Sequence, residues 1–278
     1  MLVAGAETEC LLRCPVCKKP LYAQATRFIC PQAHSFDRAR QGYVNLLQSQ
    51  QSSKRNHGDD RLMIEARRRF LDTGHYLPLQ RELIDAVYFY TAPDGVIIDA
   101  GCGECWYTAA IAEKMPRARI LGFDISKYAL KWAAHRGHAP LLAVASCFAM
   151  PVADACANSV LNIFSPLAAG EYARVLKPGG HLFRVVPGEK HLWELKQAVY
   201  DTPLPNRPEK QALEGFRLLE CRFIARGMEL RSGEEIQALF QMTPYYYRTA
   251  AKDRERIEAL VELKTHMEFQ LLIYERLR

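Results

Sequence analysis

Short apolar runs alternate with longer amphipathic stretches through the middle of the chain. Residues 96–98 and 119–123 are apolar runs of strand length, and the amphipathic residues 107–115 between them end before Pro116. Strands of a parallel sheet are continuously apolar because helices cover both of their faces. The same alternation predicts further helices at 79–90, 127–136 and 169–176, further strands at 141–145, 159–164 and 181–186, and a turn at 177–180. The pattern therefore predicts an α/β fold built on a doubly wound parallel sheet.

The two ends of the chain have patterns of their own. From about Gly215 onward we expect strands at 216–223 and 226–230, helices at 234–240 and 252–264, and a last strand at 269–274. Near the N-terminus, residues 61–71 read as an amphipathic helix with its apolar positions on one face. Arg67 and Arg68 fall largely on the other faces of that helix. They indicate either a solvated arginine surface or a contact with RNA phosphate.

Four candidate metal ligands lie close together before that helix. Cys14, Cys17, Cys30 and His34 give the pattern C-x2-C-x12-C-x3-H, in which two ligand pairs on tight turns flank a short hairpin. Three thiolates and an imidazole suit a tetrahedral zinc site. The stretch is too short to build a core unaided, so the metal would supply much of its folding free energy. Four unrelated buried residues are the alternative, and Cys10 stands outside the pattern.

Composition narrows the class of protein. The 278 residues are 49% hydrophobic and 24% charged, which suits one large domain with a small module. No apolar run reaches the roughly 20 residues of a membrane span, and the N-terminus does not read as a signal segment. We therefore expect a cytoplasmic protein without membrane contact. In that compartment the nine cysteines would be reduced thiols or metal ligands.

The positive charge is concentrated toward the N-terminus. Residues 1–75 carry 12 of the 37 lysines and arginines but 7 of the 31 acidic residues, which is +5 of the net charge of +6. Such a local field attracts phosphate groups. A solvated basic surface without a partner explains the charge equally well.

The stretch VIIDAGCGECWY, residues 96–107, joins a predicted strand to the following helix. Asp99 ends the strand, and Gly101 and Gly103 make a turn in which the backbone can approach a ligand closely. A third glycine at the dinucleotide-fingerprint spacing is absent. The next strand ends in Asp124, about 20 residues on, where such folds hold a ribose hydroxyl pair. An ordinary strand–turn–helix corner is the alternative. Polar residues follow the strand ends in the same way at Asp99, Asp124, Ser146, Ser165 and His191.

The loop matches D-x-G-x-G, motif I of the class I S-adenosylmethionine-dependent methyltransferases. Nearly the whole chain resembles the bacterial 23S rRNA (guanine-N1)-methyltransferases, which act on a guanine in the hairpin of helix 35. The resemblance rests on CPVC, ICPQAHSFDRARQGYVNLL, HGD, EARRRFLDTGHYLPL, DAGCGE, KPGG, PGEKHLWELK and QMTPYYYR. It implies a Rossmann-like class I methyltransferase domain at 76–278, a small zinc-binding RNA-recognition module at 1–48, and a linker with a hinge helix at 49–75.

The resemblance also implies ligands and partners. One Zn²⁺ would be held by Cys14, Cys17, Cys30 and His34. Contacts with S-adenosylmethionine are expected at Tyr76, Asp99, Gly101, Gly103, Glu104, Cys105, Trp106, Asp124, Ser146 and His191. From the residues alone, Tyr76 would be a packing residue and His191 a cap or a solvent-exposed group. The RNA-binding candidates are Arg38, Arg40, Arg67 and Arg68, with 23S rRNA as the partner. A homodimer stays open.

Two positions depart from the family pattern. Cys105 stands where the loop usually has its last glycine. We expect right-handed helical dihedrals there, with the side chain pointing away from the cofactor, because Trp106 and Tyr107 continue into the helix. Residues 162–166, NIFSP, replace a more usual aromatic–Ala–Pro end. Both departures bear on catalytic efficiency more than on the fold.

The implied reaction is methyl transfer to N1 of guanine. N1 lies on the Watson–Crick edge, so the base must be unpaired or flipped from its stack. Neutral guanine carries a proton on N1, so a general base is expected. The sequence does not identify that base; Asp59 is a candidate, and a helix N-cap is its alternative role. Two other functions stay open: a small-molecule methyltransferase of the same fold, and a non-catalytic zinc-containing RNA-binding protein.

Overall fold

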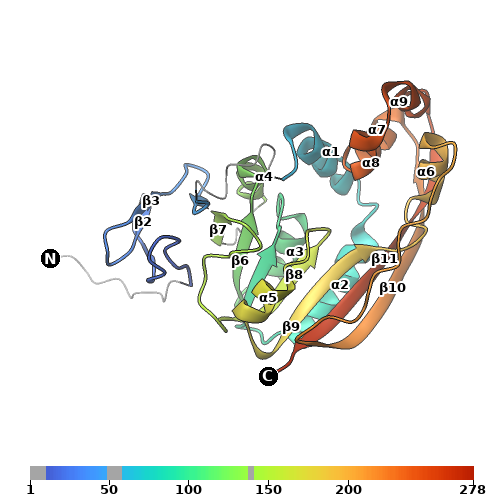
Figure 1. Ribbon diagram of the computed structural model, residues 1–278. Helices are drawn as coiled ribbons and strands as arrows, with labels where there is room; N and C mark the ends of the chain where they lie inside the picture. The colour runs from blue at the N-terminus through green and yellow to red at the C-terminus, as the bar shows by residue number, and fades with distance from the viewer. Residues whose placement is uncertain (1–10, 49–57, 137–140) are drawn as a thin grey trace.

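An eight-stranded mixed sheet runs through the centre of the molecule (Figure 1). The computed structural model describes residues 11–48, 58–136 and 141–278. The strand order is β10–β11–β9–β8–β5–β6–β7–β4. The strands are β4 (Val44–Asn45), β5 (Val96–Ala100), β6 (Arg119–Asp124), β7 (Leu141–Val144), β8 (Ala157–Ile163), β9 (Leu176–Pro187), β10 (Phe216–Leu230) and β11 (Leu263–Arg276). All neighbours from β9 to β4 pair in parallel, whereas β11 pairs antiparallel with both β9 and β10. The predicted parallel sheet is confirmed, with an antiparallel hairpin added at one edge.

Side chains of the central strands alternate between two cores, one on each face of the sheet. Ile97 and Leu161 contribute to one core, and their neighbours Ile98 and Val160 contribute to the other. All four are fully buried. Apolar residues therefore follow one another along these strands, because helices or the N-terminal module cover each face.

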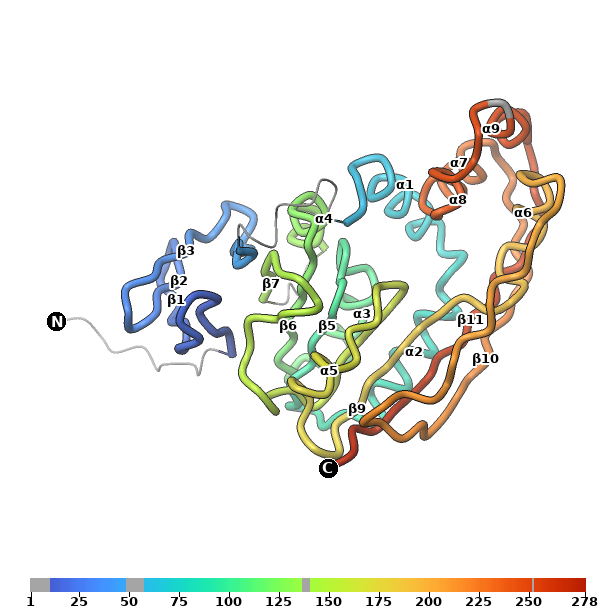
Figure 2. Tube along the Cα trace, in the orientation of Figure 1, coloured from blue at the N-terminus to red at the C-terminus, as the bar shows by residue number. Residues whose placement is uncertain are grey.

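Helices and loops gather over the carboxyl ends of the parallel strands. The helices are α1 (Arg61–Asp72), α2 (Leu77–Tyr90), α3 (Trp106–Lys114), α4 (Lys127–Ala133), α5 (Ala169–Val175), α6 (Trp193–Val199), α7 (Gly233–Gln241), α8 (Pro244–Arg248) and α9 (Ala251–Glu258). Helices α2, α3 and α7 contribute to the first core, and α5 contributes to the second. The long strands β9, β10 and β11 reach beyond the parallel strands and carry α6 to α9 (Figure 2). Helix α1 packs against α7, so the first helix of the chain meets the C-terminal third.

The N-terminal module packs on the edge of this sheet (Figure 1). Its own antiparallel sheet consists of β1 (Tyr22–Ala23), β2 (Arg27–Ile29) and β3 (Ser35–Asp37). Leu12, Leu21 and Phe28 are buried in the second core of the large sheet. The following strand β4 pairs with β7 and becomes an edge strand of the large sheet. The module and the large sheet thus share apolar surface and backbone hydrogen bonds.

The predicted elements of the C-terminal third need correction. Residues 216–223 and 226–230 form one strand, because β11 pairs with β10 along its whole length, through Gly227. The helix expected at 252–264 ends at Glu258, and residues from Leu263 onward belong to β11. Helices α6 and α8 were not predicted. The full length of β10 could not be predicted from sequence periodicity, because it depends on pairing with β11.

The turn expected at 177–180 lies inside β9 as an irregularity. Leu176 pairs with Ala157 and His181 pairs with Ser159, so the residues between them on β9 outnumber those on β8.

Among the described residues, no helix combines the length and hydropathy that a membrane crossing requires. Cys10 and most of the predicted exposed linker at 48–54 lie outside the described residues.

Candidate active site and metal centre

A cavity of about 820 Å³ lies over the carboxyl ends of β5, β6, β7, β8 and β9. Its walls come from the loops after these strands, from α1, from residues 206–209 and from the α7–α8 region. Ligands of doubly wound sheets bind at this edge. Of the predicted cofactor residues, the cavity wall contains Tyr76, Asp99, Gly101, Gly103, Glu104, Trp106, Asp124, Ser146 and His191. The fold therefore gathers nine of the ten positions, and Cys105 is the exception.

The turn after β5 needs its glycines for two reasons. Gly101 has a φ of +97°, which favours glycine, and an added Cβ would come within 2.6 Å of the Ser165 Cβ atom. Ser165 is fixed there because its Oγ donates a 2.6 Å hydrogen bond to the Ala100 carbonyl oxygen. The backbone N–H of Gly103 donates to Asp124 Oδ2 at 2.9 Å. Backbone contacts thus join the loops after β5, β6 and β8 into one surface.

Asp124 holds the cofactor loop from the end of β6. Its Oδ2 accepts from Gly103, and its Oδ1 accepts from the backbone N–H of Ser126 at 2.8 Å. Burial raises the pKa of this carboxyl, while the two backbone hydrogen bonds oppose the shift. A carboxylate has about four acceptor positions, so Asp124 can still accept hydrogen bonds from ligand hydroxyls.

Three polar atoms in the cavity region are buried without a hydrogen-bond partner: Asp99 Oδ1, Glu104 Oε2 and the Tyr107 hydroxyl. Asp99 is 2% exposed, and its Oδ2 accepts a hydrogen bond from the Thr108 hydroxyl. Burial raises its pKa to about 7, against the lowering effect of Thr108. Burial likewise raises the pKa of Glu104 to about 7, although Arg136 pairs with it at 2.6 Å. Unpaired buried acceptors call for a ligand that carries donors or positive charge. The methionine end of S-adenosylmethionine fits this requirement.

Tyr76 and His191 meet at another part of the wall. The Tyr76 hydroxyl lies 3.5 Å from His191 Nε2, and the backbone N–H of Glu268 donates to His191 Nδ1 at 3.2 Å. Burial lowers the pKa of His191 to about 3, so its imidazole is neutral near pH 7. Because Nδ1 accepts a hydrogen bond, the ring proton lies on Nε2 and faces Tyr76. These residues therefore offer neutral polar groups to a ligand.

The conformation predicted for Cys105 is wrong. The residue has a φ of +63° and a ψ of +29°, the left-handed conformation, and it is the N-cap of α3. The helix begins only at Trp106, so the helical dihedrals of Trp106 and Tyr107 do not extend back to the cap. The Cys105 side chain is fully buried beside Cys102, Leu130 and Leu142, outside the cavity wall. The expected direction, away from the cofactor, agrees with this packing.

The arginine candidates lie in different surroundings. Arg38 and Arg40 are exposed on the N-terminal module. Arg67 lines the cavity and forms an ion pair with Asp59. Asp59, the candidate base from the sequence, also lines the cavity. Arg68 lies 4.1 Å from the centre of the Trp132 ring and makes a cation–π contact instead. The structure thus brings only Arg67 to the cavity.

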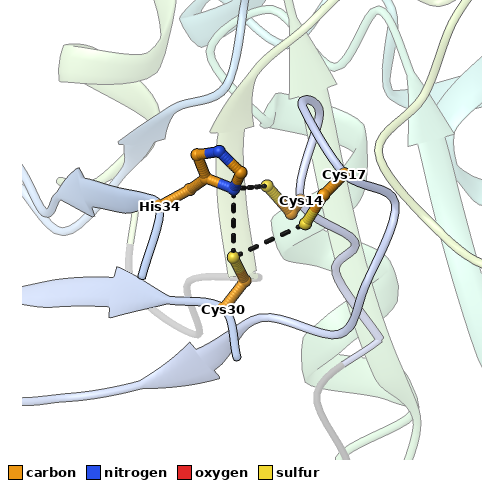
Figure 3. A group of neighbouring side chains, drawn as sticks. All are labelled: Cys14, Cys17, Cys30 and His34. Carbon is orange, nitrogen blue, oxygen red and sulfur yellow. Dashed lines mark hydrogen bonds between the residues drawn. The ribbon is translucent and has the colours of Figure 1, made fainter. Parts of the chain in front are cut away.

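The four predicted zinc ligands converge from two turns of the module (Figure 3). Their ligand atoms all lie within 4.8 Å of one another. His34 Nδ1 is 3.3 Å from Cys30 Sγ and 3.7 Å from Cys14 Sγ, and the sulfur atoms of Cys17 and Cys30 are 3.5 Å apart. This spacing and donor set fit one tetrahedral Zn²⁺.

Several cavity residues were missed from the sequence. Phe164, Arg184 and Glu209 all line the cavity. Arg184 had a visible signal, since it is a charged residue inside the apolar run of a predicted buried strand. Glu209 had none, because the segment after α6 contains no motif that was recognised.

Comparison with known proteins adds two domain matches and several relatives. A zinc-ribbon model described as "RlmA, N-terminal" matches residues 12–55, and one described as "Methyltransferase domain" matches residues 98–184. The chain is 38% identical to the "23S rRNA (guanine(748)-N(1))-methyltransferase" of Streptomyces fradiae, over 68% of this chain and 67% of that protein. It is 31% identical to the "Putative 23S rRNA (guanine-N(1)-)-methyltransferase YxjB" of Bacillus subtilis (strain 168), over 92% of each chain. A similarly described protein of Micromonospora griseorubida is 40% identical over 66% of this chain and 68% of its own.

Proposed function

The chain belongs to the family of 23S rRNA (guanine-N1)-methyltransferases, and we propose that it methylates N1 of a guanine in the helix 35 hairpin of 23S rRNA. The main support is the similarity to the Bacillus subtilis protein, because the match covers 92% of each chain and therefore includes both the methyltransferase domain and residues of the zinc module. A shared cofactor domain alone would support methyl transfer to many acceptors. The additional zinc module favours rRNA as the methyl acceptor, because the rRNA methyltransferase relatives match this chain beyond the cofactor domain.

The chain is an S-adenosylmethionine-dependent methyltransferase with one structural zinc. When bound, S-adenosylmethionine supplies a methyl group that its positively charged sulfur makes reactive. The protein's part is to bind and orient the two reactants. We assign the methionine end to Asp99 and Glu104, whose buried acceptors have spare capacity, and the ribose hydroxyls to Asp124. Tyr76, Ser146 and His191 complete the proposed cofactor wall.

The acceptor must reach the cavity as an unpaired base, because N1 takes part in Watson–Crick pairing. Helices α1 and α8 both contribute to the cavity wall, through residues such as Met63 and Tyr245. A flipped guanine enclosed by these helices would be separated from bulk water. The residues at 1–48 and the hinge region 49–75 would bind the surrounding RNA, through Arg38 and Arg40 on the module and Arg67 near the cavity. A homodimer stays a prediction that analytical ultracentrifugation can check.

The test uses a transcript of the helix 35 hairpin and S-adenosylmethionine with a labelled methyl group. We expect one methyl group per hairpin, recovered as N1-methylguanosine after digestion and mass analysis. A small-molecule methyltransferase would bind the hairpin weakly and leave it unmodified. A non-catalytic RNA-binding protein would bind the hairpin with steep salt dependence but give no heat on titration with S-adenosylmethionine.

A further inference from the structure

The cavity contains a charged pair beyond the residues assigned to the cofactor. Arg184 on β9 and Glu209 in the segment after α6 both line it, and Arg184 Nη1 lies 2.6 Å from Glu209 Oε1. The side chain of Arg184 is 10% exposed, whereas that of Glu209 is 30% exposed. A buried guanidinium requires a partner. Glu209 supplies it and still presents carboxylate surface to the cavity.

A chain of hydrogen bonds fixes this pair relative to the cofactor loop. Arg184 Nε donates to Asn162 Oδ1 at 3.3 Å, and Asn162 Nδ2 donates to Ser165 Oγ at 2.6 Å. Ser165 in turn donates to the carbonyl oxygen of Ala100, directly before Gly101. Asn162 and Arg184 are register partners on the adjacent parallel strands β8 and β9. Arg184, Asn162 and Ser165 therefore link Glu209 by polar contacts to the backbone directly before the glycine loop.

The segment that carries Glu209 is anchored as well. Asn206 accepts a 2.7 Å hydrogen bond from Lys196 Nζ and donates a 2.7 Å hydrogen bond to the Gly188 carbonyl oxygen. Its backbone N–H donates to the Glu189 carbonyl oxygen at 2.8 Å. Arg207 on the same segment also lines the cavity, and Glu209 lies near enough to the buried Tyr274 hydroxyl on β11 to help raise the pKa of that group. The carboxylate is thus held in place before any substrate arrives.

We propose, resting on the function proposed above, that Arg184 and Glu209 form the guanine end of the cavity and that Glu209 is the general base. The Watson–Crick edge of guanine carries two adjacent donors, N1–H and the 2-amino group, beside the acceptor O6. A carboxylate has two oxygens that can accept from such a donor pair. Arg184 has N–H groups that its bonds to Glu209 and Asn162 do not use, and one of them can donate to O6.

In the proposed step, N1 of guanine exchanges its proton for the methyl group. The N1–H bond breaks and its proton passes to the Glu209 carboxylate. The electron pair left on N1 forms the bond to the methyl carbon, while the pair of the carbon–sulfur bond stays on sulfur. The products are N1-methylguanine, neutral S-adenosylhomocysteine and a protonated Glu209, which returns its proton to water. Arg184 stabilises the negative charge that shifts onto O6 as N1 loses its proton.

Asp59, the base suggested by the sequence, lies in a different part of the cavity wall. Its backbone carbonyl accepts from Ser126 Oγ at 3.5 Å, beside Asp124 at the end of β6. Its carboxylate pairs with Arg67, as that of Glu209 pairs with Arg184, so the two candidates differ in position and not in pairing. This position suits the ribose side of the cofactor and favours Glu209 as the base.

The first test compares the pH dependence of single-turnover methylation of the hairpin in Glu209→Gln and wild type. We expect the variant to be about 10²–10⁴-fold slower near neutral pH even at saturating hairpin, with binding weakened by at most about tenfold because the 2-amino group loses its carboxylate partner. Its rate should then rise about tenfold per pH unit, because hydroxide replaces the missing base, while the wild-type rate levels off. Glu209→Asp keeps the charge beside Arg184 and should recover much of the rate. Glu214→Gln, an exposed change in the same segment, is the matched control.

The second test measures binding without catalysis, by fluorescence anisotropy of hairpins with guanosine or inosine at the target position. Inosine lacks the 2-amino group, so wild type should bind it about tenfold more weakly or worse. Glu209→Gln should lose most of this preference. A variant with the wild-type pH profile and an unchanged preference would overturn the assignment, as would high-pH recovery in Asp59→Asn alone. If wild type did not methylate N1, the proposed function would fail, and the inosine comparison would still decide the guanine site.

Discussion

Cys105 combines a well-packed side chain with a backbone conformation that non-glycine residues rarely adopt. The side chain packs in a small buried cluster with Cys102 and Leu130, while the backbone adopts left-handed dihedrals that glycine tolerates best. The side chain lies outside the cavity wall, so its direction is compatible with the expectation that the sulfur points away from the cofactor. The sequence could not indicate the backbone conformation, because the N-cap is set by the turn before it and not by the helix after it.

The Cys105 backbone can be tested by comparing two small replacements. Both Cys105→Gly and Cys105→Ala remove the sulfur, but only glycine relieves the left-handed strain. We expect Cys105→Gly to be more stable than Cys105→Ala by about 1 kcal/mol, the reverse of the usual order near helices. Chemical denaturation measures the difference. A more stable alanine variant would contradict the left-handed assignment, and we expect the Kd for S-adenosylmethionine to change less than about tenfold in either variant.

Asp99 predicts a pH dependence of cofactor binding. Its pKa is about 7 in the folded protein against an ordinary value of 3.8, so the carboxyl is largely protonated at mildly acidic pH. Its contribution to stability is therefore full below the ordinary pKa and is lost as the pH rises through about 7. A positively charged ligand favours the ionised form. We expect the affinity for S-adenosylmethionine, measured by calorimetry, to fall below pH 7 by up to about tenfold per unit. Asp99→Asn should make this dependence shallower and leave the part that Glu104 contributes, since burial raises its pKa to about 7 as well. An equally steep profile in that variant would exclude Asp99.

At the scale of elements, the strands and helices of the parallel sheet could be predicted, whereas for the C-terminal hairpin only parts of the strands were predicted and not their lengths. The parallel strands are buried on both faces, so their apolar runs are unmistakable. The hairpin strands β10 and β11 are half-exposed and alternate irregularly, and their lengths are set by pairing with each other. Sequence patterns contain no direct record of that pairing. The ion pair between Arg184 and Glu209 could not be predicted for the same reason, since the fold alone brings them together, although Arg184 stands out as a charged residue in an apolar run.

The zinc module is the element whose stability depends most on its ligands. Cys14 is fully buried, next to the core that the module shares with the large sheet. We expect metal analysis to give one zinc per chain and Cys14→Ser to lose it, with a lower melting temperature. Cys221→Ser, outside the cluster, is the control and should keep its zinc. Full zinc content in a Cys14, Cys17 and Cys30 triple serine variant would refute the site.

At the scale of the whole molecule, the module and the methyltransferase domain are less separate than the sequence suggested. The division at residue 48 follows the zinc ligands, but β4 and buried side chains such as Leu12, Leu21 and Phe28 connect the module to the large sheet. Deleting residues 1–50 would therefore remove the proposed RNA contacts and part of the core together. Charge reversal on the module surface is the cleaner test of RNA binding.

Arg38→Glu with Arg40→Glu should weaken hairpin binding and reduce its salt dependence. Each lost phosphate contact makes the slope of log K against log salt shallower by about 1. The same reversal at Arg217 and Arg226, on the outer strand β10, is the control and should leave the slope unchanged. Filter binding across a salt series gives both slopes. If the two double variants gave equal slopes, Arg38 and Arg40 would not be RNA contacts, and the RNA would bind elsewhere on the protein.

The central claim, N1 methylation of one guanine in helix 35, is tested most directly on ribosomal RNA itself. We would incubate 23S rRNA from a strain that lacks the modification with the protein and S-adenosylmethionine, and then map it by reverse transcription. A methyl group on N1 blocks Watson–Crick pairing. We therefore predict one new strong stop, one nucleotide to the 3′ side of a guanine of the helix 35 hairpin. No new stop, or a stop elsewhere in the 23S rRNA, would contradict the account.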